Sequence, residues 1–503
     1  MARLCKTAQT PPRARPGATI VVLPRRWLYA LLAVLSFLFA IEVLEGILRS
    51  PTLIWNEIRL TRSMALLHGF PLYPGERELG PIIGTLHTPV SHLLFLPASA
   101  IHDPTMAILA GSLTAFLLVF SALGFALIRF ASSVTVVTAL SFLLCGFLIV
   151  NSEGAFNTAF FIHTDAAALA FATVACSLVA SRNRITTASL WLSAAACALA
   201  IASKQTIAPV AFAIALYVAI AEGGKRFALF LLALAVTGAS ILAILLFVFP
   251  ARAFLFNTLV LAAHRPLKPG YLQILADTYR MGRLEALPAL LPILFLAIWT
   301  WTASQQFFVS NRWIVFLIAS IAVTPVCVKA IVTVGSDVNH LGFVLYFLFV
   351  AAGLAIQQYF NDPNPATRLS SRIFLASGIL VSLAPGMILA LPASLRNLRA
   401  NPSQTAYDFD TRHPGIAYFP CDPMTSLLRD GKLYHLDIAL YDREVAGHPL
   451  TPEQIRSGLP PGFMLVALPP GELLQSQALQ GVFAGFVPIT DPELPAWNVF
   501  RRP

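Results

Sequence analysis

Long apolar runs separated by short polar segments dominate the chain. Most are near the roughly 20 residues that a helix needs to cross a bilayer. The pattern predicts a polytopic helical membrane bundle of about eleven spans, at residues 27 to 48, 104 to 128, 132 to 150, 159 to 180, 187 to 203, 205 to 221, 227 to 249, 286 to 303, 313 to 332, 339 to 357 and 372 to 392.

Basic residues in the short loops indicate the topology. With the N-terminus inside, the short outer turn at 151 to 158 has no Lys or Arg, as the positive-inside rule requires. We therefore expect a cytoplasmic tail at 1 to 26, a transmembrane domain at 27 to 393 and a C-terminus on the outer side. The inner loops then hold Arg129, Arg182, Arg184, Lys225, Arg226, Arg312, Arg368 and Arg372.

Two outer segments, 49 to 103 and 250 to 285, are long enough to have structure of their own. Apolar and charged residues alternate over 53 to 68 with a helical period, which predicts an amphipathic helix in the membrane interface. Residues 89 to 101 are apolar but too short to span, so we expect a re-entrant or interfacial helix.

From about 394 the composition changes. Pro, Gly and charged residues return, and strand-like stretches such as FMLVALP (463 to 469) alternate with turns. Residues 394 to 503 are therefore expected to form a small α/β extramembrane domain, which the topology places in the periplasm if the membrane is a bacterial inner membrane.

Composition narrows the class further. Of 503 residues, 57% are hydrophobic and 12% are charged, against about 25% charged in soluble domains, which argues against a soluble enzyme. Lys plus Arg exceed Asp plus Glu by 34 − 24 = 10, but no basic stripe with interleaved aromatic residues suggests nucleic acid. The six cysteines form no disulfide framework or metal-spaced pair.

Ionisable residues beside outer span ends are the candidates for chemistry, because charge at membrane depth is costly. Glu57, on the amphipathic segment, has the chemistry of a general base; the alternative is a solvated charge beside Arg59 and Arg62. Asp165 follows His163 at the start of a span, where a neighbouring His or Lys would keep a buried carboxylate ionised. Helix capping explains it equally well.

Further along, Lys204 lies between two apolar runs and offers a positive charge to a phosphate, unless it is a helix-end lysine that snorkels to the surface. Arg265 and Lys268, in the outer segment at 250 to 285, are further phosphate-binding candidates or part of a solvated basic loop.

The motif GSDVNHL brings Asp337, Asn339 and His340 to the start of the tenth span, either as site residues or as ordinary caps. His87, in GTLHTPVSH, is a candidate for orienting an acceptor or the base, although a lone histidine is commonly structural. All these residues fall on one predicted face of the membrane, which favours a shared cavity.

Motifs for soluble cofactors are absent from the sequence. It has no G-x-x-x-x-G-K-[ST] loop, no G-x-G-x-x-G after a strand and no H-E-x-x-H. A soluble nucleotide donor is therefore not supported, and no cofactor is assigned, although a divalent metal remains possible.

The motifs WNEIRLTRSMALLHGFPLY, TLHTPVSHLLFLP, HTDAAALAF, SKQT and GSDVNHL together resemble, in that order, the polytopic GT-C glycosyltransferases. Within them they look most like the bacterial branch related to protein mannosyltransferases and aminoarabinose transferases. The resemblance covers about residues 27 to 392. It implies transfer of a sugar from a polyprenyl-phosphate carrier to a glycolipid, polysaccharide or protein acceptor at the outer face of the membrane.

By this resemblance the acidic residue of the first loop, Glu57, is the catalytic base, and the remaining candidates bind substrate. Such loops often carry two adjacent acids, whereas Asn56 stands in the first position here. The main alternative is a transporter or flippase of a lipid-linked or amphipathic solute, which would predict internal symmetry and helices broken near the midplane. A non-catalytic scaffold, in which Glu57, Asp165 and Lys204 do not converge, is the other.

Overall fold

The computed structural model describes residues 25–131, 135–180, 185–303, 311–382, 386–398, 401–469 and 471–503. Nearly all of the predicted tail at 1 to 26, and the predicted inner-loop residues Arg182 and Arg184, lie outside these ranges.

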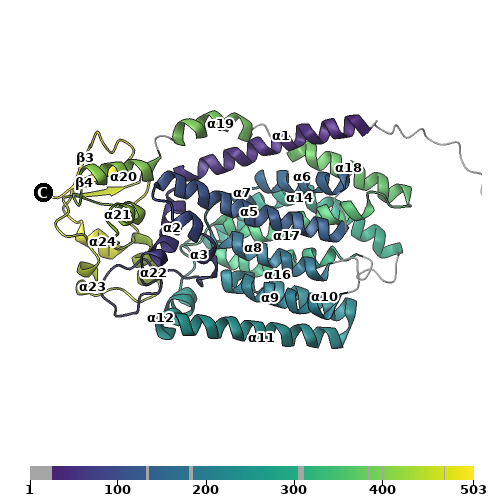
Figure 1. Ribbon diagram of the computed structural model, residues 1–503, viewed down its shortest axis with the longest axis horizontal. Helices are drawn as coiled ribbons and strands as arrows, with labels where there is room; N and C mark the ends of the chain where they lie inside the picture. The colour runs from purple at the N-terminus through teal and green to yellow at the C-terminus, as the bar shows by residue number, and fades with distance from the viewer. Residues whose placement is uncertain are drawn as a thin grey trace, which may run out of the picture.

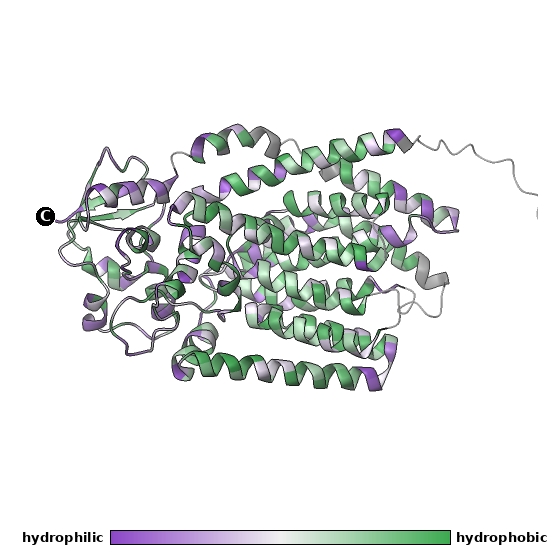
Figure 2. Ribbon diagram, in the orientation of Figure 1, coloured by the Kyte–Doolittle hydropathy of each residue, from purple (hydrophilic) through white to green (hydrophobic). Residues whose placement is uncertain are grey.

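Long apolar helices lie side by side in a bundle, with a smaller domain at one end (Figures 1 and 2). Within the described residues, seven helical segments are long and apolar enough to cross a membrane, so the predicted polytopic helical class is confirmed. They contain α1 (Arg25–Arg49), α5 (Pro104–Ala131), α10 (Pro209–Glu222), α11 (Gly224–Val248), α14 (Tyr271–Ala303), α16 (Ile314–Ile331) and α17 (Leu341–Tyr359).

The other predicted spans are helical but shorter or divided. The segment at 132 to 150 forms α6 (Val136–Val150), which continues after a bend of 101° into α7 (Glu153–Phe160). The predicted spans at 159 to 180 and 187 to 203 form α8 (Thr164–Val179) and α9 (Thr187–Ser203). The last predicted span, 372 to 392, is divided between α18 (Pro365–Ser382) and α19 (Gly386–Asn397), which packs against α1.

One boundary differs clearly from the expectation. Helix α14 begins at Tyr271, whereas the apolar pattern predicts a start at 286. Its first half carries Asp277, Arg280, Arg283 and Glu285, so hydropathy alone cannot detect it. The outer segment predicted at 250 to 285 is therefore partly the extension of a spanning helix.

Short elements fill the segment between the bundle and the smaller domain. The predicted amphipathic helix is α2, and both its faces are covered by protein: Leu60 and Met64 join the bundle core, whereas Ile54 and Ile58 join the core of the smaller domain. The short elements of the transmembrane domain are η1 (Ser50–Thr52), α2 (Ile54–Leu67), α3 (Val90–Leu94), α4 (Leu96–Ser99), η2 (Gln205–Ile207), α12 (Ala251–Leu255), the π-helical turn η3 (Phe256–Val260), α13 (Leu261–Ala263) and η4 (Val338–His340).

The C-terminal domain combines short helices with a four-stranded sheet in the order β1-β2-β4-β3. β1 and β2 are parallel and the other pairs are antiparallel; the predicted strand at 463 to 469 is β2. The elements are α20 (Pro402–Arg412), β1 (Ala417–Tyr418), α21 (Pro423–Asp430), α22 (Asp437–Val445), α23 (Pro452–Ser457), β2 (Leu465–Leu468), α24 (Gln477–Val482), β3 (Val487–Ile489) and β4 (Asn498–Arg501).

A buried arginine ties this domain to the first loop. Arg443 of α22 donates hydrogen bonds to the carbonyl oxygens of Pro74, Gly75 and Glu76 at 2.9 to 3.2 Å. These bonds satisfy loop carbonyls that would otherwise be buried without donors. The loop between α2 and α3 is thereby held against the C-terminal domain.

Close backbone contact between α7 and α17 positions the two segments that form the site described below. A Cβ on Gly342 would collide with the carbonyl oxygen of Gly154. We expect Gly342→Ala to lower the free energy of unfolding by about 1–3 kcal/mol, because the two helices must separate. Gly224→Ala is the matched control, since a Cβ there meets nothing within 4 Å. Equal melting temperatures of the two variants in detergent would contradict this packing.

Candidate active site

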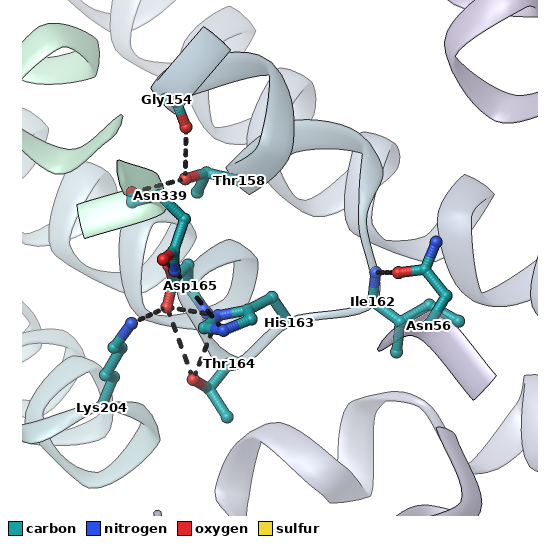
Figure 3. Close-up of polar contacts among 9 residues, drawn as sticks. All are labelled: Asn56, Gly154, Thr158, Ile162, His163, Thr164, Asp165, Lys204 and Asn339. Atoms are coloured by element: carbon teal, nitrogen blue, oxygen red, sulfur yellow. Dashed lines mark hydrogen bonds and ion pairs between the residues drawn. The ribbon is translucent and has the colours of Figure 1, made fainter. Parts of the chain in front are cut away.

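A buried carboxylate is in contact with polar groups from several helices (Figure 3). Oδ1 of Asp165 accepts a hydrogen bond from Nζ of Lys204 and lies 2.5 Å from Nδ1 of His163. Oδ2 accepts one from Nδ2 of Asn339 at 2.8 Å. The side chains of Asp165 and Lys204 are 0% and 1% exposed. Two opposite charges buried together in this way compensate one another's loss of water.

Each member of this cluster stands where a helix begins or ends. Asp165 is in the first turn of α8, where the helix dipole favours a negative charge. Lys204 has an extended backbone between α9 and η2, and Asn339 lies in η4, just before α17. The start of α8, the end of α9 and the turn before α17 are therefore the positions that present these side chains.

Asn56 fixes the backbone that leads into the cluster. Its Nδ2 donates to the carbonyl of Ser50 at 2.9 Å. Its Oδ1 accepts from the N–H of Ile162, also at 2.9 Å (Figure 3). Because an ionised carboxylate has no donor for the Ser50 carbonyl, an acid at position 56 would lose one of these bonds. The asparagine thus joins α2 to the residue that precedes His163.

The predicted phosphate-binding residues of the second outer segment have protein partners. Arg265 forms an ion pair of 2.9 Å with Asp442 of α22, and Nζ of Lys268 donates to the carbonyl of Ser336 at 2.6 Å. Gly335 has φ +72°, and any side chain there would collide with the Arg265 guanidinium. The loop before η4 therefore requires glycine at this position for two reasons.

The other residues predicted to share a cavity, His87, His340 and Asp337, differ in their burial and in their partners. The ring of His87 is centred 6.4 Å from that of His163. His340 is buried, and its Nδ1 has no hydrogen-bond partner within the described part of the chain. Asp337 is exposed and caps η4 through the N–H of Val338 at 2.7 Å, which corresponds to the capping alternative.

Glu57 is placed away from the charged cluster. It is fully buried, and its Oε1 accepts from the hydroxyl of Thr61 at 2.8 Å and from the N–H of Met424 at 2.6 Å. Its carboxyl contacts that of Asp422 in the C-terminal domain. The residue predicted as catalytic base therefore sits in the contact between α2 and the C-terminal domain, and does not converge with Asp165 and Lys204.

The two touching carboxyls require a proton. Burial raises the pKa of Glu57 above its usual range, and the charge of Asp422 raises it further. Burial also raises the pKa of Asp422, to about 6. Glu57 Oε2 and Asp422 Oδ2 have no other partner among the described residues, so a shared proton is the hydrogen bond that the pair can make.

A polar cavity of about 340 Å³ adjoins the cluster. Arg59 and Arg62 of α2 line one wall, and His87 and His163 line it from the loop and from the start of α8. Successive helical residues are about 100° apart, so Arg59 lies about 200° around α2 from Glu57. The face of α2 opposite Glu57 is therefore the one that borders the cavity.

A larger apolar cavity of about 800 Å³ lies next to the polar one, lined mainly by α9, α11 and the α12 to η3 turn. Thr88 and Gln205 line it, and they directly follow His87 and Lys204 in the chain. Consecutive residues, His87 and Thr88, thus line the polar and the apolar cavity, and Lys204 of the charged cluster precedes a residue that lines the apolar one.

The sequence interpretation gave no binding role to Arg59, Arg62 or Asn56. The spacing of Arg59 and Arg62, three residues apart on a helix, indicates that they share a face. Which face borders a cavity depends on the packing of α2 between two domains. Asp442 and Asp422 were missed because their partners are distant in the sequence.

The part of the chain that the structure describes shows no arrangement of side chains typical of a metal site. No group of three or more His, Cys, Asp or Glu side chains there is arranged to hold a metal ion. The positive charges next to the cavities come from arginine and lysine side chains.

These features define a membrane-embedded protein with a GT-C-like fold and a charged site at one end of its bundle. A similar solved structure is that of ArnT from Cupriavidus metallidurans, an aminoarabinose transferase, bound to undecaprenyl phosphate. The match has a TM-score of 0.55 at 12% identity and covers 95% of this chain and 98% of that one. No protein-family model and no curated protein sequence matches the chain.

We expect Asp165→Asn to lower the free energy of unfolding by about 3–5 kcal/mol, because Lys204 would then be a buried charge without a counterion. The double variant Asp165→Asn with Lys204→Met should recover part of this loss, since it removes both charges. Denaturant titration of the purified proteins in detergent measures both. A double variant that is less stable by the sum of the two single losses would exclude this coupling.

The Glu57–Asp422 pair should make stability depend on pH. A carboxyl whose pKa is raised by folding stabilises the protein fully below about pH 4, and that contribution is lost as the pH rises through its folded pKa, about 6 for Asp422. The melting temperature should therefore fall over this window. Asp422→Asn, which can still cap α21 and donate to Glu57, should reduce the fall. The exposed Glu453→Gln should keep the wild-type profile; identical profiles for all three would refute the shared proton.

Proposed function

We propose that this protein is a membrane glycosyltransferase that moves a sugar from a polyprenyl-phosphate-linked donor to an acceptor hydroxyl. The observation that carries the proposal is the proximity of two cavities: a large apolar one suited to an isoprenoid chain and a polar one beside the Asp165 cluster are lined by consecutive residues, Thr88 and His87. A lipid-linked sugar has the same division between an apolar tail and a polar head. The likeness to ArnT, solved with undecaprenyl phosphate, supports the same class.

The reaction is a displacement at the anomeric carbon. The acceptor oxygen attacks this carbon, the bond from the carbon to the phosphate oxygen breaks, and polyprenyl phosphate leaves with the electron pair. The acceptor hydroxyl gives up its proton to a general base. Positive charge at the site stabilises the negative charge that develops on the leaving phosphate.

The geometry supports His163 as the general base more directly than Glu57. Nδ1 of His163 lies 2.5 Å from the Asp165 carboxylate and 3.2 Å from the Asp165 backbone N–H, and Nε2 lies 3.5 Å from Nδ2 of Asn339, so these neighbours fix the orientation of the ring. The ring also lines the polar cavity. Glu57 is buried against Thr61, Met424 and Asp422 and does not line that cavity.

The site and the C-terminal domain lie at the same end of the bundle (Figure 1). We propose that this end faces the periplasm of a bacterial cell, with the N-terminus in the cytoplasm. The positive residues of the predicted inner loops support this orientation. The acceptor would then be a glycolipid, polysaccharide or protein of the cell envelope.

The test is transfer from a panel of radiolabelled polyprenyl-phosphate sugars by the purified full-length protein, with cell-envelope extracts as acceptors. His163→Ala should lower the rate about 10²–10⁴-fold, the usual contribution of a general base. Glu57→Gln should retain most of the activity. The opposite result for the two variants would assign the base to Glu57.

The same panel tests the class of protein. Acceptor-dependent release of polyprenyl phosphate supports the transferase. If the wild type instead moves a fluorescent lipid-linked sugar across a liposome bilayer without cleaving it, the protein is a flippase and the proposal fails. Thermal unfolding in the same detergent serves as the folding control for every variant.

A further inference from the structure

Two neighbouring residues of α22, in the C-terminal domain, each hold one outer segment of the transmembrane domain. Asp442 forms an ion pair of 2.9 Å with Arg265, in the segment before α14. Arg443 donates three hydrogen bonds to carbonyl oxygens of residues 74 to 76, in the loop after α2. Successive helical residues point about 100° apart, so one turn of α22 reaches both segments. Both side chains are buried, which gives these contacts more weight than ion pairs on a surface have.

The contact of Asp442 continues into the loop before η4. The guanidinium of Arg265 lies against Gly335, where a Cβ would collide with it, and Oδ1 of Asp442 is 3.5 Å from the position of that Cβ. Asn339 lies further along the same loop and donates a hydrogen bond to Asp165 at 2.8 Å. Asp442 is therefore connected to the buried carboxylate of the site through Arg265 and this loop.

Backbone pairing joins the two segments that meet at Asp442. The N–H of Lys268 donates to the carbonyl of Val332 at 2.7 Å, and the N–H of Val334 donates to the carbonyl of Pro266 at 3.0 Å. The residues between them form an antiparallel β-bridge. The two segments are thus a short ribbon, in which a displacement of one strand moves the other. The ion pair of Asp442 anchors this ribbon to the C-terminal domain.

Arg443 has a similar connection to the wall of the polar cavity. The carbonyl groups that it binds directly follow Tyr73, whose hydroxyl donates to the carbonyl of His87 at 2.8 Å. His87 lines the polar cavity, and its ring is centred 6.4 Å from that of His163. The hydrogen bonds of Arg443 therefore fix the loop that holds His87.

We propose that Asp442 and Arg443 are positioning residues for sugar transfer: Asp442 holds Asn339 in place, and Arg443 holds His87. This inference rests on the proposed function and adds to it a role for the C-terminal domain. Neither residue lines the polar cavity, so each acts only through the segment that it binds. The site is then complete only while α22 is docked on both segments.

Steady-state transfer by the purified full-length protein, with the donors and acceptors given above, tests the role of Asp442. Asp442→Asn keeps the size of the side chain but loses the charge that holds Arg265. It should lower kcat about 10–100-fold, the effect of moving a group at the site by about 1 Å, and leave the donor KM unchanged. Asp442→Glu, which keeps the carboxylate, should recover most of the rate. Glu453→Gln, at an exposed position of the same domain, is the matched control and should behave like wild type.

A double-variant cycle shows whether Asp442 acts through Arg265. Arg265→Gln should lower kcat as Asp442→Asn does, and the double variant should be no slower than the slower single variant, because both changes remove the same contact. Losses that multiply would mean that Asp442 acts by another route. A raised donor KM with an unchanged kcat would assign the pair to donor binding. Either result would overturn the positioning role.

Arg443 is tested by a variant that keeps its charge. Arg443→Lys cannot donate to three carbonyl groups at once, because it lacks the planar fork of the guanidinium. It should therefore also lower kcat at an unchanged donor KM. Arg456→Lys, at an exposed position of α23, is the matched control and should keep the wild-type kcat.

Hydrogen exchange measured by mass spectrometry separates positioning from a general loss of stability, and it does not depend on transfer. Asp442→Asn should speed exchange at Lys268 and Val334, the amides that join the ribbon, and Arg443→Lys should speed it in the loop at 74 to 82. The amides of α5, in the bundle core, should keep their wild-type rates in both variants. Faster exchange throughout the protein, or unchanged exchange in these two segments, would contradict the inference.

The proposed function and this inference fail separately. If the wild type transfers no sugar but both variants loosen their own segments as expected, the transferase falls and the positioning of the two segments stands. If the wild type transfers sugar and both variants keep its kcat, the transferase stands and the positioning role falls.

Discussion

The carboxylate of Asp165 is the constraint on which the arrangement of the site depends. A charge enclosed in a helical bundle is tolerated only when its oxygens are paired, and here the partners come from the end of α9, the residue before α8 and the turn before α17. Satisfying this one group therefore fixes three helix ends relative to each other.

Helix α2 connects the segment around Asp165 to the C-terminal domain. Asn56 reaches toward the backbone before His163, Glu57 toward Asp422, and Arg59 borders the polar cavity. These three nearly consecutive residues point in different directions because a helix turns by about 100° per residue. One short helix thus contacts the bundle, the C-terminal domain and the site. A movement of the C-terminal domain would therefore shift the α2 side chains that line the polar cavity.

The charges near the site fall into two groups with different consequences. Lys204 and Arg265 are paired with carboxylates, so their contribution is to structure and to the orientation of neighbours. Arg59 and Arg62 line the polar cavity and form no ion pair within the described residues, and they are attracted only over longer distances by Asp165, Asp337 and Asp442. Pairing therefore separates the cations that hold carboxylates of the fold from those that line the cavity.

The sequence by itself determined the class of fold, because apolar runs of spanning length and a late change in composition are properties of local segments. It also indicated Asp165, Lys204 and Asn339 as site candidates, since polar residues at the ends of apolar runs are visible without a structure. It could not decide which neighbour Glu57 contacts, because that depends on how α2 packs between the bundle and the C-terminal domain. The contact of Glu57 with Met424 joins residues that are 367 positions apart in the chain. Tertiary packing alone decided which cations are paired and which line the polar cavity.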